Sequence, residues 1–386
     1  MVPFTLLIKP SGSDCNMDCR YCFYKNRAPQ LGRGRQRMSD EVLEKLIKDY
    51  LKLGFPVASF AWQGGEPALM GLDFYEKVVQ LQKKYAASDQ KVSNSIQTNA
   101  ILLNDRWCRF LHDNNFLLGI SIDGPREFHD YYRLDLAGSG TFDRVIRAIE
   151  TCKKHKVEFN TLTLLNDKNV GHPDRLFDFF IANNVRYLQF IPCVELDRHS
   201  GGVADFSITP AQYGQFLCRI FDRWYDYGPT KLSIRNFDSI LSYCVAGKHT
   251  ICTFDRQCSQ YIVVEYTGDC FCCDFFVEPK WRLGNILETP IAKLAAGGKK
   301  RTFARNKQNL SNKCLLCRHL DLCRGGCIKD RIHKTEHRAQ RPERKRNVES
   351  YFCESYKCFF DYAMPKFSQI AAAVNAASPL KTHPFL

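Results

Sequence analysis

Three cysteines near the N-terminus, Cys15, Cys19 and Cys22, lie in the stretch SDCNMDCRYCFYKN. Chance is a poor explanation for their C-x3-C-x2-C spacing. A structural zinc ion takes four ligands, but the nearest other cysteine is Cys108 and no histidine lies near the loop. A four-iron cluster offers one ligand position per iron, so three thiolates leave one iron open. The spacing therefore predicts an iron–sulfur cluster whose fourth iron binds a substrate or a cofactor.

A second concentration of cysteines lies toward the C-terminus, where twelve of the nineteen occur at or after residue 244. One group contains the stretch CTFDRQC at 252–258 and GDCFCCDFF at 268–276. The other is a C-x2-C-x5-C-x3-C run at 314–327, followed by Cys353. Such a run indicates metal, and zinc is its default explanation in a generic protein. The iron–sulfur interpretation is favoured because a cluster-binding loop already precedes it.

The elements that position these residues can be predicted from hydrophobic periodicity. Strand patterns occur at 4–8, 57–62, 92–97, 116–122, 158–164 and 186–191, and helical patterns occur near 39–53, 73–85, 105–114, 141–155 and 173–183. Six successive β-then-α units imply parallel strands joined by right-handed crossovers, in an open doubly wound sheet or a barrel. Chemistry then belongs at the C-terminal ends of the strands. The three-cysteine loop follows the first strand, QGGEP the second and DGP the fourth.

Composition and charge limit the classes of protein to which this chain can belong. The formal charge of +14 is compatible with a nucleic-acid partner, but the densest basic run, at 337–346, is polar, contains a proline and has no interleaved aromatics. We interpret it as a solvated loop and expect no nucleic-acid partner. The N-terminus lacks a signal-peptide pattern, and no apolar run approaches the roughly 20 residues of a membrane helix. We therefore expect a cytoplasmic protein without a membrane partner.

The three-cysteine loop, with Tyr21 before its last cysteine, resembles the signature of the radical S-adenosylmethionine (SAM) superfamily. The stretch WQGGEP at 62–67 resembles the GGE motif of that family. The resemblance implies a partial (β/α)6 TIM-type barrel, in which the open iron chelates SAM and reduction of the cluster yields a 5′-deoxyadenosyl radical. Carried over by position, the SAM-binding residues are Tyr21, Gly65, Ser121, Arg133 and Val194.

The C-terminal half resembles the SPASM domain of radical enzymes that modify peptides, and more closely the anaerobic sulfatase-maturating enzymes. The resemblance to these enzymes covers most of the chain and includes NSIQTNA, LQFI, KWRLGNI and the ending YFCESYK. It implies two auxiliary [4Fe–4S] clusters, three clusters in all. The first would use Cys252, Cys258, Cys273 and Cys327, and the second Cys314, Cys317, Cys323 and Cys353. Because Cys270 and Cys272 lie beside Cys273, either is an alternative ligand.

This resemblance implies a fold class and a domain plan. We expect an α/β protein with a partial barrel at 1–235, a cysteine-rich SPASM domain at 236–370 and a C-terminal tail at 371–386. The implied reaction oxidises a cysteine or serine of an unfolded sulfatase to Cα-formylglycine. Asp274, next to a cluster ligand, resembles the family's base. The partners expected are the sulfatase or another peptide and a flavodoxin- or ferredoxin-like electron donor.

Two other functions remain open at this stage. A related radical enzyme that makes a thioether, a crosslink or an epimer in another peptide shares both domains. A non-enzymatic zinc-ribbon protein that binds nucleic acid accounts for the charge, but it leaves the three-cysteine loop and the GGEP stretch unexplained.

Overall fold

The computed structural model describes residues 2–25, 34–197, 200–332 and 348–377. The basic run at 337–346 lies outside these residues. The chain divides into two compact units. Unit 1 comprises residues 1–122, 129–161 and 258–304, and unit 2 comprises residues 123–128, 162–257 and 305–386.

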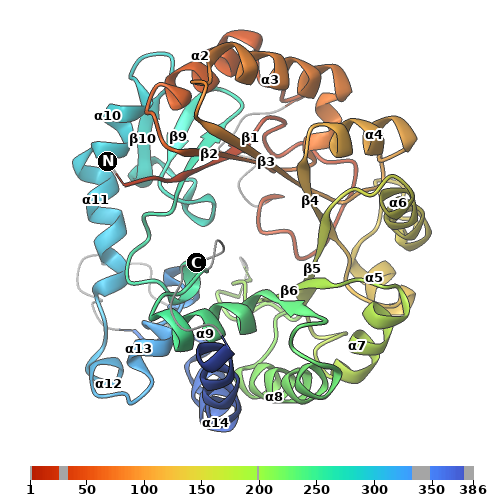
Figure 1. Cartoon of the computed structure of the whole chain (residues 1–386), viewed down its shortest axis with the longest axis vertical. Helices are drawn as coiled ribbons and strands as arrows, with labels where there is room; N and C mark the ends of the chain where they lie inside the picture. Colours follow the sequence, from red (N-terminus) through yellow and green to blue (C-terminus); the bar gives the residue numbers. More distant parts are fainter. Residues whose placement is uncertain (1, 26–33, 198–199, 333–347, 378–386) are drawn as a thin grey trace. The chain divides into compact units, whose positions relative to one another are not determined.

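Unit 1 contains the strands that carry the N-terminal motifs (Figure 1). Four of them are the expected parallel strands, β1 (Thr5–Lys9), β2 (Val57–Trp62), β3 (Lys91–Thr98) and β4 (Phe116–Ser121). Three more come from later in the chain, β8 (Tyr261–Glu265), β9 (Asp269–Phe271) and β10 (Arg282–Asn285). The order is β10-β9-β8-β1-β2-β3-β4, with β8 parallel to β1 and the β8–β9 and β9–β10 pairs antiparallel.

Helices follow the parallel strands of unit 1 and lie along one face of them (Figure 1). They are α2 (Asp40–Leu51), α3 (Leu72–Tyr85), α4 (Asp105–Asp113) and α6 (Phe142–Lys154). Helix α2 shows why these segments are helical. Ser39 accepts a hydrogen bond from the Val42 N–H at its N-terminus, and Leu43, Leu46 and Ile47 form a buried stripe. The helices cover the strands through such buried stripes, so the loops at the ends of the strands are left to form the site.

Unit 2 contains the second part of β5 (Phe159–Leu165), followed by β6 (Tyr187–Pro192) and β7 (Ser233–Ile234). Strands β6 and β7 pair in parallel. Its helices include α7 (Pro173–Ala182), α8 (Pro210–Tyr227), α9 (Arg235–Ala246) and α14 (Cys353–Ala377). Aromatic rings of Phe221, Phe237 and Phe359 hold α8, α9 and α14 together. This packing fixes the start of α14, where Cys353 lies.

The six predicted strands and five predicted helices are confirmed, and the fold is a mixed α/β fold with a parallel-strand sheet. The sequence did not predict that β8 would pair with β1. The apolar residues of its sequence YIVVE are buried because β8 joins the edge of the N-terminal sheet. The boundaries at 235 and 370 stay predictions, although α14 continues unbroken to Ala377.

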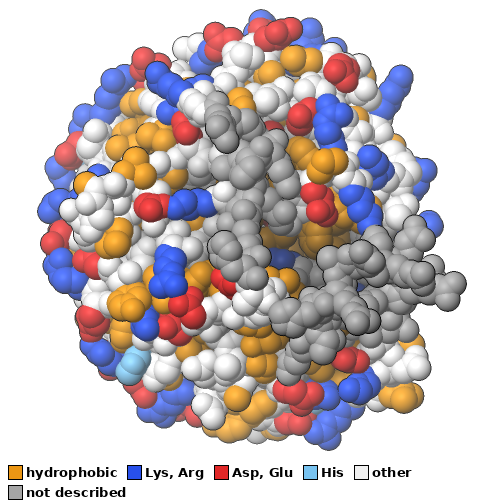
Figure 2. All heavy atoms as spheres, turned by 180° about the vertical axis from the view of Figure 1, so that it is seen from behind, with side chains coloured by type: hydrophobic (Ala, Val, Ile, Leu, Met, Phe, Trp, Pro, Cys, Tyr) orange, Lys and Arg blue, Asp and Glu red, His pale blue; other side chains and the backbone are white. Residues whose placement is uncertain are grey.

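The net positive charge is locally balanced on the face drawn in Figure 2, where the described Lys and Arg side chains are interspersed with Asp and Glu. Individual ion pairs contribute to the charge balance of the chain: Arg223 pairs with both Asp174 and Asp178. None of the helices within the described residues combines the length and apolar character that crossing a membrane requires.

Candidate active site

The three-cysteine loop follows β1 and is held against the GGE loop that follows β2. The backbone N–H groups of Gly65 and Glu66 donate to the carbonyls of Gly12 and Asp14, both at 2.7 Å. A Cβ atom on Gly65 would lie 1.9 Å from the Asp14 carbonyl oxygen. Only glycine therefore permits this approach, which brings the two motifs together.

Glu66 is fully buried, and burial raises the pKa of its carboxyl group. Its carboxylate accepts hydrogen bonds from the Ala68 N–H (2.9 Å), the Thr98 hydroxyl (2.7 Å) and the Asn99 N–H (2.8 Å). These three donors tie the GGE loop to the end of β3. Through these hydrogen bonds the Glu66 side chain holds in place the GGE loop, against which the three-cysteine loop packs.

The thiols of the loop lie near one another. Burial, with smaller contributions from Glu66, Cys19 and Cys22, raises the pKa of Cys15 to about 12. The Asn99 side-chain amide also donates to the Cys15 sulfur, 3.7 Å away. Bound iron would hold these thiols as thiolates, because metal ligation deprotonates cysteine. The grouping fits a cluster held by three cysteines.

The predicted SAM-binding residues are only partly brought together. Arg133 donates to the Tyr21 hydroxyl at 3.1 Å, and both residues are buried in unit 1. Ser121 ends β4 and accepts from the Gln97 side chain at 2.9 Å. Val194 follows β6 in unit 2, where its carbonyl accepts from Lys329 at 2.9 Å. Four of the five predicted residues thus lie in unit 1.

Asp274 opens the 3-10 helix η4 (Asp274–Phe276), directly after Cys273. The Cys273 thiol donates to one carboxylate oxygen at 3.6 Å, and the Lys9 ammonium lies 3.7 Å from the other. The Asp274 side chain is 18% exposed, whereas Lys9 is 1% exposed. The arrangement therefore presents a carboxylate at an accessible position, with a buried cation behind it.

Glu265 is a further acid of this region that the sequence pattern did not reveal. It ends β8, pairs in register with Lys9 across the parallel β1–β8 ladder and accepts a hydrogen bond from the Tyr24 hydroxyl. Burial, opposed in part by Lys9 and Tyr24, raises its pKa to about 7. The signal that could have found it is an acid closing an otherwise apolar strand.

The cysteines beside Asp274 differ in burial. Cys270 and Cys272 are buried, whereas Cys273 is partly exposed. Burial lowers the pKa of the nearby Lys300, while Cys272, Cys273 and Cys258 raise it, so these thiols lie near one lysine within unit 1. In unit 2, burial raises the pKa of Cys327 to about 12, with Asp330 and Cys252 contributing.

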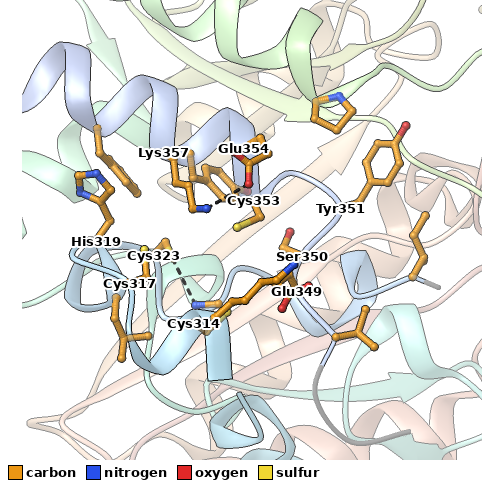
Figure 3. A pocket seen from close by; sticks show the side chains of 18 residues that line it. Cys314, Cys317, His319, Cys323, Glu349, Ser350, Tyr351, Cys353, Glu354 and Lys357 are labelled. Atoms are coloured by element: carbon orange, nitrogen blue, oxygen red, sulfur yellow. Dashed lines mark hydrogen bonds and ion pairs between the residues drawn. The ribbon is translucent and has the colours of Figure 1, made fainter. Parts of the chain in front are cut away.

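The four cysteines predicted for the second auxiliary cluster surround one cavity of about 420 Å³ in unit 2. Figure 3 shows that they come from separate segments: α12 (Asn312–Leu315), the turn after it, α13 (Leu320–Cys323) and the start of α14. Burial raises the pKa of Cys353 to about 11, and the thiols of Cys314 and Cys323 add to the rise.

This arrangement differs from a single-ion site. Nowhere in residues 2–25, 34–197, 200–332 and 348–377 do three or more His, Cys, Asp or Glu side chains form a group suited to one metal ion. In a [4Fe–4S] cluster each cysteine binds a different iron, so its ligands enclose a space rather than meet at a point. Four cysteines around a cavity are therefore compatible with a cluster of this kind.

Comparison with known proteins agrees with this geometry. Residues 10–180 match the Radical SAM superfamily, and residues 252–318 match SPASM, an iron–sulfur cluster-binding domain. A cysteine-type anaerobic sulfatase-maturating enzyme of Clostridium perfringens is 38% identical over 96% of this chain and 99% of its own length. The chain belongs to the anaerobic sulfatase-maturating enzymes. A serine-type enzyme of Bacteroides thetaiotaomicron is also 38% identical, over 94% of this chain and 90% of that protein.

Solved structures extend the comparison. A structure described as native anSMEcpe with bound AdoMet and Cp18Cys peptide has a TM-score of 0.88 and 38% identity, and covers 96% of this chain and 100% of that chain. A structure of Streptococcus suis SuiB bound to S-adenosylmethionine, 17% identical with a TM-score of 0.61 over 85% of this chain and 73% of that chain, shares the fold alone.

Membership in the anaerobic sulfatase-maturating enzymes confirms the expected enzyme class. The radical SAM and SPASM domains imply SAM and [4Fe–4S] clusters as cofactors. The individual ligands, the SAM-binding residues and Asp274 stay predictions.

Three buried lysines, Lys9, Lys300 and Lys307, were not singled out from the sequence, because a lone lysine in a mixed segment gives no signal of burial.

Proposed function

We propose that this enzyme oxidises a cysteine or serine side chain in an unfolded segment of a sulfatase to Cα-formylglycine. Two similar proteins are named as cysteine-type and serine-type sulfatase-maturating enzymes. A similar solved structure is described as containing AdoMet and a peptide. The observation that carries the proposal is Asp274, an accessible carboxylate placed next to Cys273 and backed by Lys9.

The proposal assigns the remaining predicted residues to binding. Cys15, Cys19 and Cys22 hold the first cluster, and Tyr21, Gly65, Ser121, Arg133 and Val194 bind SAM. The two auxiliary clusters use Cys252, Cys258, Cys273 and Cys327, and Cys314, Cys317, Cys323 and Cys353. When bound, SAM and the clusters supply a one-electron oxidant that removes a hydrogen atom from the β-carbon of the substrate, and an acceptor for the second electron.

Asp274 then takes the thiol or hydroxyl proton of the substrate. A carboxylate suits this task because it accepts a proton from a group within hydrogen-bond reach. Lys9 orients the carboxylate through the ion pair at its second oxygen. Because Asp274 is adjacent to Cys273, a proposed cluster ligand, the proton and the electron leave the substrate at the same end of the site.

The proposal includes a cellular setting. A radical enzyme needs a low-potential electron source, and we assign this role to a flavodoxin- or ferredoxin-like protein. All nineteen cysteines lie in the described residues and carry free thiols. Free thiols in such number are typical of a reducing compartment, so we place the reaction in the cytoplasm, where the sulfatase chain is still unfolded.

The test uses reduced enzyme, SAM and a peptide with the sulfatase motif under strict anaerobiosis. We expect a serine peptide to lose two hydrogen atoms and a cysteine peptide to exchange its thiol for an aldehyde, both visible by mass spectrometry. Absence of aldehyde from both peptides, in enzyme with its full iron content, would contradict the proposal.

An Asp274→Asn variant tests the base. Loss of a positioned proton acceptor lowers the rate by about 10²–10⁴-fold, while iron content and SAM binding should stay at wild-type levels. An Asp269→Asn variant, altered five residues away on β9, is the control. Wild-type peptide oxidation by Asp274→Asn would argue for a different peptide modification.

A further inference from the structure

Two cysteines outside the proposed ligand sets lie on helices that pack together within unit 2 (Figure 1). Cys218 belongs to α8, and Cys358 belongs to α14, the helix that begins at the proposed cluster ligand Cys353. Both carry free thiols, and Cys358 is exposed whereas Cys218 is half-buried. The proposed function uses neither of them, so their role is open.

The two helices approach closely at Gly214, one turn before Cys218. A Cβ atom at Gly214 would lie only 3.3 Å from the Cα atom of Ser355, so the missing side chain lets the two backbones come together. The same Cβ position would lie 3.6 Å from the Cβ atom of Cys358 and 3.7 Å from its sulfur. The Cys358 side chain therefore points from α14 toward α8.

Hydrogen bonds on either side of this contact fix the register of the two helices. On one side, the Ser355 hydroxyl donates to the carbonyl of Pro210, the first residue of α8, at 2.6 Å. On the other, the Tyr362 hydroxyl donates to the carboxylate of Asp222, whose oxygens lie 2.8 and 2.7 Å away. Residues at i and i+4 share one face of a helix, so Cys218 faces α14 together with Asp222. The register thus places the two thiols opposite each other.

The two thiols also interact across the contact. Burial raises the pKa of the Cys218 thiol to about 12, and Cys358 adds to the rise. A disulfide needs Cβ atoms about 4 Å apart. Facing helices bring Cβ atoms this close where a small residue lets their backbones approach, as Gly214 does. The pair therefore has the contacts of a dithiol that can close with little movement of either helix.

A second pair of thiols, in unit 1, provides a contrast. The sulfur atoms of Cys108 and Cys152 are 3.7 Å apart, but both residues are 0% exposed. The susceptibility of a thiol to oxidation follows its exposure and its thiolate character. Proximity is thus common to both pairs, whereas access from solvent distinguishes the pair that contains Cys358.

We propose that Cys218 and Cys358 form a redox-active dithiol, a modification site for the low-molecular-weight disulfides of an oxidised thiol pool. The thiolate of exposed Cys358 attacks the small disulfide, which forms a mixed disulfide and releases one small thiolate. The Cys218 thiolate then attacks the Cys358 sulfur and releases the second. Two protein thiols are oxidised, one small disulfide is reduced, and the two protein thiol protons end on the two released small thiols.

The new bond anchors the start of α14 to α8. It lies five residues after Cys353, so it restricts the segment that carries a proposed ligand of the second auxiliary cluster. A reduced thiol pool reverses the reaction. The site therefore couples the thiol redox state of the cell to the anchoring of this helix. The consequence for Cys353 rests on the ligand set proposed above, whereas formation of the bond does not.

Anaerobic treatment of the iron-loaded enzyme with oxidised glutathione tests the inference. Free thiols are then alkylated, and the chain is digested and analysed by mass spectrometry without reduction. We expect peptides linked through Cys218 and Cys358, at least about tenfold more abundant than peptides linked through the buried Cys108 and Cys152. In Cys218→Ser we expect a glutathione adduct to accumulate on Cys358, and in Cys358→Ser we expect neither product.

Hydrogen exchange tests the anchoring. In the linked enzyme we expect exchange at the backbone amides of residues 353–362 to slow roughly tenfold relative to a Cys358→Ser variant treated identically. Linked peptides with slowed exchange support the proposal. It would be overturned by a wild-type glutathione adduct on Cys358 without linkage, by no reaction at either thiol, by equal linkage of Cys108 to Cys152, or by unchanged exchange. Iron content and peptide oxidation of the untreated enzyme test the proposed function separately, so the two failures are distinguishable.

Discussion

At the scale of single residues, the site combines side chains that the sequence marks plainly with side chains that it does not. The cysteines are recognisable because spacing alone restricts what they can bind. Glu265 carries only a weak signal, because one acid that closes an apolar strand is ordinarily a surface residue. Its importance appears only when β8 pairs with β1 and places the acid opposite Lys9. Tertiary pairing, which local pattern does not encode, creates its environment.

Glu265 gives the enzyme a pH-dependent stability. Its pKa in the folded protein is about 7, above the roughly 4.3 of an unfolded chain, so the folded state holds the proton more tightly. The associated stability is fully present below about pH 4 and is lost as the pH rises toward 7. Between pH 5.5 and 7.5, the wild-type enzyme should therefore lose roughly 2 kcal/mol relative to a Glu265→Gln variant.

Anaerobic thermal melting at these two pH values checks this prediction. The gap between the melting temperatures of Glu265→Gln and the wild type should widen by a few degrees at the higher pH. The exposed Glu288→Gln variant should show no widening. A constant gap for Glu265→Gln would show that Glu265 is ionised in the folded enzyme throughout this range.

At the scale of elements, the β-then-α alternation correctly predicted six strands and five helices, because each buries an apolar face with its own period. The sequence did not reveal which strands share an edge. Strand β8 lies about 250 residues from β1 in the chain, and only the folded structure shows their parallel register. Loop contacts were similarly hidden: the GGE motif indicates a cofactor-binding turn, and the structure adds its packing against the three-cysteine loop.

Gly65→Ala tests that loop contact. The new Cβ atom would overlap the Asp14 carbonyl, so the two loops must separate, at a cost of about 1–3 kcal/mol. We expect the variant to lose much of the iron bound by Cys15, Cys19 and Cys22 while the auxiliary clusters remain. Gly171→Ala is the matched control, since nothing lies within 4 Å of the position that its new Cβ atom would take. Full iron retention in Gly65→Ala would show that the loop contact is dispensable.

At the scale of the whole molecule, the proposed ligand sets divide eleven of the nineteen cysteines among one open cluster site and two fully ligated ones. The sequence predicted this division from spacing and resemblance, and the structure adds the cavity around Cys314, Cys317, Cys323 and Cys353. It also adds the buried lysines Lys9, Lys300 and Lys307, which follow from tertiary packing and have no local sequence signal.

The central claim is that three four-iron clusters serve a radical reaction, with the N-terminal loop holding one of them. Anaerobic iron and acid-labile sulfide analysis, with the visible spectrum, tests it on the wild type and on a Cys15→Ala, Cys19→Ala, Cys22→Ala triple variant. We predict about twelve irons per chain in the wild type and about eight in the variant. Zinc without sulfide, or an unchanged iron content in the triple variant, would contradict the claim.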